Sequence, residues 1–466
     1  MIGKFMEKIY CLAVDIGASN GRVILGSYDG GVIETEVLHR FKNGAEMKNG
    51  HLCWDVERLF QEIKVGMKKC AELGISPKSI GIDCFGVDFA LLDKDGRLLG
   101  DTVAYRDERS VGYRESAPLS PKDIFMKIGS LGSWFSSSYQ LMYLRDHADY
   151  MDKVAHFMHL PDYLNYRLCG VVAHEMSIAQ TSMLVNAERC EFDEELLDKL
   201  ELPKHIFKKI SLPASVVGRL SPEIVAETGI DCVVVQPCEH DTVSAMAAVP
   251  KSEGEDCIFI SSGTWSMVGT FLDRPMIRED VIEAGCSNMY LTENCTGLLR
   301  GITGLWMVQS IKKELGDEYT FDALCELAEA SDYDVVIDVN DRIFNAPESM
   351  IGAVKQYLAD RGYPAPRDLG DIMNCVYRGL ASKYAECVKG MEALTGKTYA
   401  RIYIVGGGSR DTYLNRLTAE YTGKQVYAGP AEATAIGNIA AQLTAHGIFG
   451  GLEEAVKAIP KPQKVN

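Results

Sequence analysis

Three stretches of the chain share one pattern, a run of hydrophobic residues that ends in a glycine turn. They are Ile9–Arg22 (IYCLAVDIGASNGR), Cys257–Gly269 (CIFISSGTWSMVG) and Ile402–Ser409 (IYIVGGGS). Each hydrophobic run predicts a buried strand, and a sharp turn after a strand leaves backbone N–H groups facing one concavity, which suits phosphate oxygens. Three such turns, with a His-Asp pair between the first two, predict a nucleotide clamp built from two related halves.

Predicted strands and helices alternate around these turns. The first part of the chain predicts an amphipathic helix over 54–73 with Asp55 as its N-cap, and strands over 9–15, 22–27, 32–41, 79–84 and 87–93. Residues 105–230 are richer in helix signals and irregular loops, which is typical of an insertion or lid. The remainder predicts strands over 233–236, 257–270 and 401–405, and helices over 303–316, 320–330 and 366–396, with others starting near 244, at 412 and after 430.

This order of elements predicts an α/β fold with two domains. The 466 residues exceed what a single ordinary core accommodates, so the length supports the same view. The polar segment 251–256 marks the junction. We assign residues 1–246 to an N-terminal domain and residues 247–466 to a C-terminal domain.

The composition, with 47% hydrophobic and 24% charged residues, is that of a globular protein. No stretch comes near the roughly 18–20 uninterrupted apolar residues of a membrane helix. The N-terminal segment MIGKFMEKIYCLAVD lacks a small-residue cleavage site, which favours a buried first strand over a signal peptide. We therefore expect a cytoplasmic protein, either a monomer or a homodimer.

The net charge of −17 limits the partners, because an acidic surface repels nucleic acid and anionic membranes. A nucleotide site must then supply its own positive potential, from backbone N–H groups, a metal or a few basic side chains. The 14 cysteines contain no CxxC pair, which favours buried, reduced thiols over a zinc site or a disulfide framework.

Asp15 stands at the end of the first predicted strand, where a buried acidic residue costs free energy unless it meets a cation. In one interpretation Asp15 holds Mg²⁺ through water, and the phosphate oxygens are wrapped by Ala18, Ser19, Asn20, Gly21 and Arg22. The alternative is a plain hairpin whose turn the aspartate stabilises. The segment alone leaves both open.

The two later glycine turns carry further nucleotide candidates. In SSGTWS, hydroxyl groups flank Gly263, and Thr264 is the side chain best placed to reach a terminal phosphate; a Ser/Gly hairpin is the alternative. In the other turn, the missing Cβ atoms of Gly406, Gly407 and Gly408 let a flat ring or a ribose approach the backbone. A plain loop is the alternative there.

Asp241 is the candidate for proton transfer. Phosphoryl transfer to an alcohol needs a carboxylate that takes the hydroxyl proton, and otherwise mostly positioning and charge neutralisation. Asp241, in the segment Glu239–Thr242, follows one predicted strand and precedes a predicted helix, a position that suits this task. The alternative is an N-cap, the more frequent role of an aspartate at a helix start.

A group of aromatic residues, Trp134, Phe135 and Tyr139, stands among Gly and Ser in GSLGSWFSSSYQL. These side chains either flank the face of a sugar or pack a lid. The charged segment YRDER (residues 105–109) either lines a polar pocket or forms a solvated loop.

Taken in order, these motifs resemble the FGGY family of carbohydrate kinases, and most closely its rhamnulokinase branch. The matching motifs run from about residue 8 to about residue 445 and are DIGASNGR, NGHLCWD, GIDCFGVDFALLD, AYRDER, EHDTVSA, SSGTWSMVG, GLWMVQ, YIVGGGS and GPAEATAIGN. The resemblance implies two actin-like (ribonuclease H-like) domains with ATP in the cleft between them. It also implies transfer of the γ-phosphoryl group to the 1-hydroxyl of a 6-deoxy-ketohexose such as L-rhamnulose.

The resemblance further implies a role for each matching residue. Residues 18–22 match the ATP-phosphate loop, and nucleotide contacts are implied for Thr264, Gln309 and Gly407. Sugar contacts are implied for Gly86, His240, Asp241 and Thr242, with Asp241 as the proton acceptor.

Three departures from the family pattern lie on the sugar side. Cys84-Phe85 stands where relatives have Thr-Trp, Gly129–Ser138 replaces a segment like GIQFxPFNT, and Gly301 replaces an expected Asn. The ATP-side motifs are intact, which predicts preserved chemistry. Because a site that hydrogen-bonds particular hydroxyls discriminates strongly between sugars, L-fuculose stays beside L-rhamnulose as a candidate substrate. The alternative from another class is a nucleotide-gated sugar-binding protein without catalysis.

Overall fold

The computed structural model describes residues 7–465, which divide into two compact units. The first unit runs to Ala248 and includes Leu272–Leu298 and Ala433–Ile459. The second comprises Val249–Phe271, Leu299–Glu432 and Pro460–Asn466. The domain boundary between residues 246 and 247 stays a prediction.

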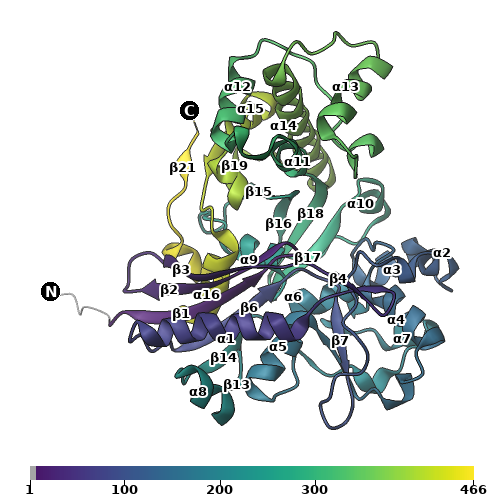
Figure 1. Cartoon of the computed structure of the whole chain (residues 1–466), viewed down its shortest axis with the longest axis vertical. Coiled ribbons are helices and arrows are strands. Elements are labelled where there is room, and N and C mark those ends of the chain that lie inside the picture. The colour runs from purple at the N-terminus through teal and green to yellow at the C-terminus, as the bar shows by residue number, and fades with distance from the viewer. Residues whose placement is uncertain (1–6, 466) are drawn as a thin grey trace. The chain divides into compact units, whose positions relative to one another are not determined.

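The first unit is built on a six-stranded sheet with the order β13-β14-β6-β1-β2-β3 (Figure 1). Its strands are Ser215–Arg219, Val233–Gln236, Ser79–Cys84, Ile9–Ile16, Asn20–Tyr28 and Glu34–Lys42. β1, β2 and β3 form an antiparallel meander, whereas β6 and β14 run parallel to β1. These bounds confirm the strands predicted from the hydrophobic runs.

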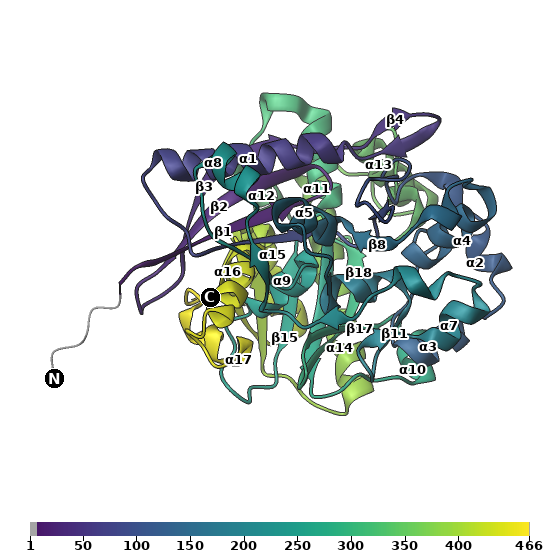
Figure 2. The ribbon, with the colours of Figure 1, turned by 90° about the horizontal axis from the view of Figure 1, so that it is seen from below.

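Helices cover both faces of this sheet, which explains why β1 is buried along nearly its whole length. α1 (Val56–Glu72) begins after Asp55, whose side chain accepts a hydrogen bond from the Arg58 backbone and so confirms the predicted N-cap. Gly66 of α1 packs against Val23, and on the other face α16 (Ala433–Ala445) packs against Gly26. Figure 2 shows α1 and α16 on opposite sides of β1, β2 and β3.

The chain between β6 and β14 forms short helices, as predicted for residues 105–230, and also two-stranded ribbons, which were not predicted there. The helices are α2 (Tyr113–Ser116), α3 (Pro121–Ile128), α4 (Ser137–His147), α5 (Leu160–Cys169), α6 (Met176–Ala179), α7 (Glu194–Lys199) and α8 (Pro222–Thr228). The strands are β7 (Phe89–Leu92), β8 (His156–His159), β9 (His174–Glu175), β10 (Val185–Asn186), β11 (Glu191–Phe192) and β12 (Ile210–Ser211).

The first unit also contains several shorter elements. They are β4 (Glu46–Lys48), β5 (His51–Cys53), α9 (Asp241–Ala247), α10 (Glu279–Glu283) and α17 (Leu452–Ala455). α9 begins three residues before the predicted start near 244, which changes the position of Asp241 relative to the helix.

A second sheet repeats the same plan, and most of its strands belong to the second unit, whereas β17 belongs to the first. The order is β17-β18-β16-β15-β19-β20-β21, with the bounds Ser287–Thr292, Cys295–Thr303, Trp265–Leu272, Ile258–Ser262, Arg401–Val405, Gln425–Ala428 and Gln463–Lys464. β16 is antiparallel to β15, and β19 and β20 follow in parallel, as β2, β6 and β14 do around β1. The prediction of two related halves is therefore confirmed at the level of topology.

Long helices connect the strands of the second unit. They are α11 (Trp306–Leu315), α12 (Phe321–Ala330), α13 (Met350–Asp360), α14 (Leu369–Thr395) and α15 (Thr412–Thr422). All but α13 were predicted, with ends that shift by a few residues. Within residues 7–465, no helix combines the length and the apolar character that crossing a membrane requires.

Candidate active site

Three carboxylates gather at one edge of the first unit's sheet. Asp15 and Asp83 are direct partners in the parallel register of β1 and β6. Beyond them, the Cys84 N–H donates to the carbonyl of Glu239, at 2.8 Å, which places Asp241 next along the same edge. Carboxyl ends of parallel strands meet at one edge, and ligands of α/β proteins bind there.

The three charges interact strongly. Burial, and then the charge of Asp15, raises the pKa of Asp83 well above its usual range, and Asp241 adds to the effect. The amide of Asn438 opposes it by donating a hydrogen bond of 2.6 Å to Asp83 Oδ2. Arg22 pairs with Asp15. Sequence reasoning missed Asp83, although the signal used for Asp15, an acidic residue ending a buried strand, is present in SIGIDC.

The first glycine turn joins two antiparallel strands, β1 and β2, so it has the hairpin geometry of the second interpretation. Asp15 and Arg22 face each other in the register of β1 and β2. The Gly17 N–H donates to the Asn20 carbonyl at 2.9 Å, and the Asn43 side chain donates to the Gly17 carbonyl at 2.8 Å. Asp15 therefore pairs across the hairpin with the same arginine that the phosphate interpretation assigned to the nucleotide.

The five residues of the predicted phosphate loop differ in their surroundings. Ser19 and Asn20 are exposed and Ala18 is half-buried, so a ligand can reach this turn. Gly21 is buried, and a Cβ there would stand 2.2 Å from the ring of Phe41. The packing of Phe41 is thus a sufficient reason for glycine at this position.

Asp241 is the first residue of α9, and its position shows that the N-cap interpretation is wrong. His240 occupies the cap position, and its side chain makes no capping hydrogen bond. Asp241 Oδ1 accepts a hydrogen bond from the Thr242 hydroxyl at 3.1 Å, and His240 Nε2 lies 3.6 Å away. The Asp241 side chain keeps 33% of its surface accessible. Its carboxylate can therefore meet a ligand.

The surroundings tune both members of the His-Asp pair. Although 33% of the Asp241 side chain is accessible, the surrounding protein desolvates its carboxylate and raises its pKa to about 6, against a smaller opposing effect of the hydrogen bonds from Thr242. Burial lowers the pKa of His240 to about 4, so the imidazole is neutral near pH 7. A carboxylate whose pKa approaches the working pH is a stronger base than an ordinary one and is still ionised.

Gly86 lies in a strained turn between β6 and β7. The Asp88 N–H donates to the Gly86 carbonyl at 3.0 Å, and Val87 between them has φ of 71°. These are features of the γ-turn with positive φ, which is rare and costly for a β-branched residue. Asp88 anchors the turn because it accepts hydrogen bonds from Trp54 Nε1 at 2.6 Å and from the Tyr105 N–H at 3.0 Å.

A row of aromatic rings lies beside this turn. Phe85 is 4.7 Å from Trp54 and 6.0 Å from Tyr105, between ring centroids. Phe135 extends the row, 5.4 Å from both Tyr105 and Trp134. Tyr139, by contrast, is only 1% exposed and belongs to a core cluster formed by residues between 89 and 206. Trp134 and Phe135 are half-buried and so remain able to contact a sugar face, whereas Tyr139 is too buried to do so.

Two predicted nucleotide residues of the second unit touch each other. The Thr264 hydroxyl donates to Gln309 Oε1 at 2.9 Å. The start of α11 holds the turn in place, because the Leu305 and Trp306 N–H groups donate to the carbonyls of Gly263 and Thr264 at 2.8 and 3.1 Å. This turn joins β15 to β16 as a hairpin, and Thr264 is exposed on it.

The triple glycine packs on the same turn, and its three members differ. A Cβ on Gly408 would stand 2.0 Å from Ser262 Oγ, so only glycine fits there. Gly406 has φ of 82°. Gly407 is exposed, and a Cβ on it would meet no described atom within 4 Å. Gly407 is thus the member that leaves room for a ligand.

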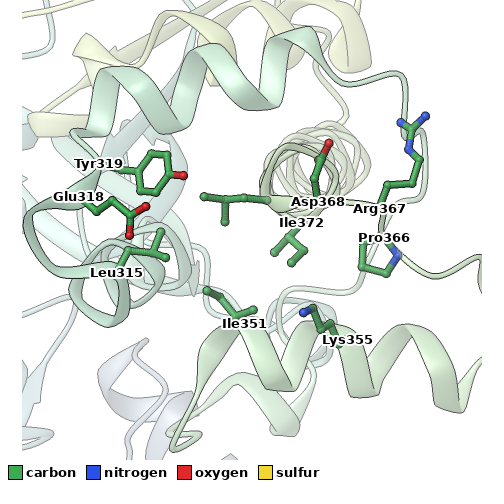
Figure 3. A pocket seen from close by; sticks show the side chains of 10 residues that line it. Leu315, Glu318, Tyr319, Ile351, Lys355, Pro366, Arg367, Asp368 and Ile372 are labelled. Carbon is green, nitrogen blue, oxygen red and sulfur yellow. The ribbon is translucent and has the colours of Figure 1, made fainter.

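A cavity of about 280 Å³ lies elsewhere in the second unit. Leu315, Ile351, Lys355 and Ile372 point toward it from α11, α13 and α14 (Figure 3). Its lining includes none of the predicted site residues. Separately, among residues 7–465 no group of three or more His, Cys, Asp or Glu side chains is arranged to hold a metal ion, so Asp15 as a metal ligand stays a prediction.

Comparison with known proteins identifies the class. Residues 10–248 match the N-terminal domain of the FGGY family of carbohydrate kinases, and residues 258–446 match its C-terminal domain. The chain therefore belongs to the FGGY family of carbohydrate kinases. With the repeated sheet plan, this confirms the predicted pair of actin-like (ribonuclease H-like) domains.

Individual relatives agree with this assignment. The chain is 39% identical to a rhamnulokinase of Halalkalibacterium halodurans over 97% of its own length and 96% of the relative's. It is 34% identical to a rhamnulokinase of Bacillus subtilis, covering 96% and 92% of the two chains. A xylulose kinase from Lactobacillus acidophilus superposes with a TM-score of 0.79 at 16% identity, covering 98% and 93%. Plasmodium falciparum glycerol kinase with ADP gives 0.78 at 14%, covering 100% and 95%. At such identities the solved structures show the fold alone.

The pKa of Asp241 predicts a pH dependence. A general base must be ionised, so kcat/KM with sugar as the varied substrate should fall about tenfold per pH unit below pH 6 and be flat above pH 7. His240, with its pKa of about 4, should add no step between pH 5 and 8. A profile that stays flat down to pH 5 would contradict the role of Asp241.

The glycine triplet predicts a contrast between two neighbouring positions. Gly407→Val should raise the KM for ATP about tenfold and leave the melting temperature unchanged, because the new side chain enters open space. Gly408→Ala should lower the free energy of unfolding by about 1–3 kcal/mol, because its methyl group collides with Ser262. Steady-state kinetics and urea unfolding of both variants check this. An unchanged KM for ATP in Gly407→Val would remove Gly407 from the nucleotide site.

Proposed function

We propose that the chain is an ATP-dependent kinase that transfers the γ-phosphoryl group to the 1-hydroxyl of L-rhamnulose, a 6-deoxy-ketohexose. One observation carries the proposal. Asp241 presents an accessible carboxylate with a pKa of about 6 beside a neutral His240, and it does not serve as the cap of its helix. An accessible carboxylate with a raised pKa is the kind of base that phosphoryl transfer to an alcohol requires.

The proposed chemistry is a single displacement. Asp241 accepts the proton of the sugar hydroxyl as that oxygen attacks the γ-phosphorus, and the bond from phosphorus to the ADP oxygen breaks. The proton on Asp241 then leaves to solvent. His240, Thr242 and the backbone at Gly86 bind the other sugar oxygens and orient the hydroxyl toward the carboxylate.

The nucleotide residues of the family motifs complete the proposal. We assign the ATP phosphates to Thr264 and to the loop residues Ala18, Ser19, Asn20, Gly21 and Arg22. Gln309 and Gly407 are assigned to the nucleoside part. The exposure of the 18–20 turn and the open space at Gly407 support these roles.

We assign a magnesium ion to the acidic edge formed by Asp15 and Asp83. Asp83 Oδ1 is buried and has no hydrogen-bond partner among the described residues, and the pKa of Asp83 is raised well above its usual range by burial and by Asp15. Hard oxygen ligands of this kind suit Mg²⁺, held with water by Asp15. When bound, the ion supplies positive charge to the phosphates.

The choice of L-rhamnulose rests on two observations. The relatives reported above are named rhamnulokinases. In addition, the neighbouring, half-buried rings of Tyr105 and Phe135 offer an apolar surface that suits the C6 methyl group of a 6-deoxy sugar. L-Fuculose carries the same methyl group and is the alternative substrate. The cytoplasmic location and the monomeric or homodimeric state stay predictions.

A sugar panel tests the substrate. With ATP, kcat/KM should be highest for L-rhamnulose and lower for L-fuculose, L-ribulose, D-xylulose and glycerol, as measured by coupled ADP release. A higher value for another acceptor would replace the proposed sugar. Sugar binding without ADP release would favour the rival class, a non-catalytic nucleotide-gated sugar-binding protein.

Replacing the base tests the chemistry. Asp241→Asn should lower kcat by about 10²–10⁴-fold, because the amide cannot take the proton. Calorimetric binding of sugar and of ATP should be largely retained, because the amide keeps the size of the carboxylate. Near-normal turnover would remove Asp241 from the mechanism.

A further inference from the structure

One short segment of the first unit contacts both sugar-side motifs. It consists of Glu175, α6 and the turn that follows, up to Thr181. Sequence reasoning assigned it no role. Three of its side chains, those of Glu175, Ser177 and Thr181, make the contacts, and we call these three residues the bracket.

Two bracket residues hold the backbone just before Asp241. The Glu239 N–H donates to Glu175 Oε2 at 3.1 Å, and the His240 N–H donates to Ser177 Oγ at 3.1 Å. Glu175 in turn accepts hydrogen bonds from the Ser177 hydroxyl at 2.6 Å and from the Ser177 and Ile178 N–H groups at 2.9 and 3.0 Å. The glutamate therefore ties the start of α6 and the chain before α9 to one carboxylate.

The third bracket residue holds the strained turn at Gly86. The Val87 N–H donates to Thr181 Oγ1 at 2.9 Å. The methyl group of Thr181 packs on Gly86, where an added Cβ would stand only 2.8 Å from it. A residue such as Val87, with φ of 71°, keeps this conformation only where its surroundings enforce it.

Hydrogen bonds within the segment connect Thr181, which holds the Gly86 turn, to Glu175, which holds the chain before Asp241. The Thr181 hydroxyl donates to the Ile178 carbonyl at 2.7 Å, and the Ile178 N–H is bound by Glu175. Glu175 and Ser177 are fully buried, so they touch no substrate. Their effect on the chemistry must pass through the groups that they hold.

We propose that the bracket positions the sugar-binding turn at Gly86 and the base Asp241 at a fixed distance from each other. This rests on the proposed function, in which Gly86 binds the sugar and Asp241 takes its proton. A displacement of about 1 Å between substrate and base costs on the order of 10²-fold in rate. Glu175, Ser177 and Thr181 are thus positioning residues for the transfer.

The test compares variants of the two bracket hydroxyl groups, each of which makes two hydrogen bonds. Thr181→Val keeps the shape and loses the acceptor for Val87, and it should raise the KM for sugar about tenfold, the factor equivalent to about 1.4 kcal/mol. Thr181→Ser keeps both hydrogen bonds and loses only the methyl group, so its KM for sugar should stay nearer the wild-type value than that of Thr181→Val. Ser177→Ala should instead lower kcat about tenfold, because it loosens the chain next to Asp241. The KM for ATP should stay unchanged in all three variants.

Ser182→Ala is the matched control. Ser182 is fully buried and its hydroxyl also makes two hydrogen bonds, to the Ala179 carbonyl and from the Leu184 N–H, but it contacts neither motif. This variant should lose stability and keep the wild-type KM and kcat. Parallel losses of activity in Ser182→Ala and the bracket variants would mean general destabilisation and would overturn the proposal.

Amide exchange gives a readout that does not depend on turnover. By mass spectrometry, Thr181→Val should speed exchange in peptides covering residues 84–90, and Ser177→Ala in peptides covering 238–243. If the wild-type protein phosphorylates none of the panel sugars, the proposed function fails. The two exchange measurements then test by themselves whether the bracket holds the two segments. Unchanged exchange in both regions, or an unchanged KM for sugar in Thr181→Val, overturns it.

Discussion

The parallel pairing of β6 with β1 is the constraint on which the first unit's site depends. It sets Asp15 and Asp83 side by side, and the hydrogen bond from Cys84 to Glu239 continues the same edge as far as Asp241. No single motif carries this arrangement, because the three residues are far apart in sequence. The strand register brings them together. The second unit repeats the sheet plan and presents Thr264 and the triple glycine at the corresponding strand ends.

Gathering acidic groups in this way costs free energy, since burial disfavours the charged form of each carboxylate. The structure offsets part of the cost locally. Arg22 pairs with Asp15, Asn438 donates to Asp83, and Thr242 donates to Asp241. The part of the desolvation cost that these contacts do not offset raises the pKa values of Asp83 and Asp241. For Asp241 this is useful, because it makes a carboxylate into a better base without preventing its ionisation at neutral pH.

Much of the fold could be predicted because its central strands are buried on both faces and several of its helices are amphipathic; β1, β6, β14 and β19 end within one residue of their predicted limits. The position of Asp241 was harder, because helix periodicity begins only at its first apolar residue and α9 starts earlier. The role of the bracket could not be predicted from the sequence. Its residues are ordinary Glu, Ser and Thr, and their role comes from contacts with motifs some 60 to 90 positions away in the sequence.

The central claim is that the carboxylate of Asp241 takes the proton of a ketose hydroxyl. A crystal structure with ADP and L-rhamnulose tests it most directly, through the distance between the carboxylate and the 1-hydroxyl oxygen. The account predicts about 2.6–3.2 Å, the range of a hydrogen bond ready for proton transfer. A bound sugar whose 1-hydroxyl lies against another side chain, with Asp241 out of reach, would contradict it.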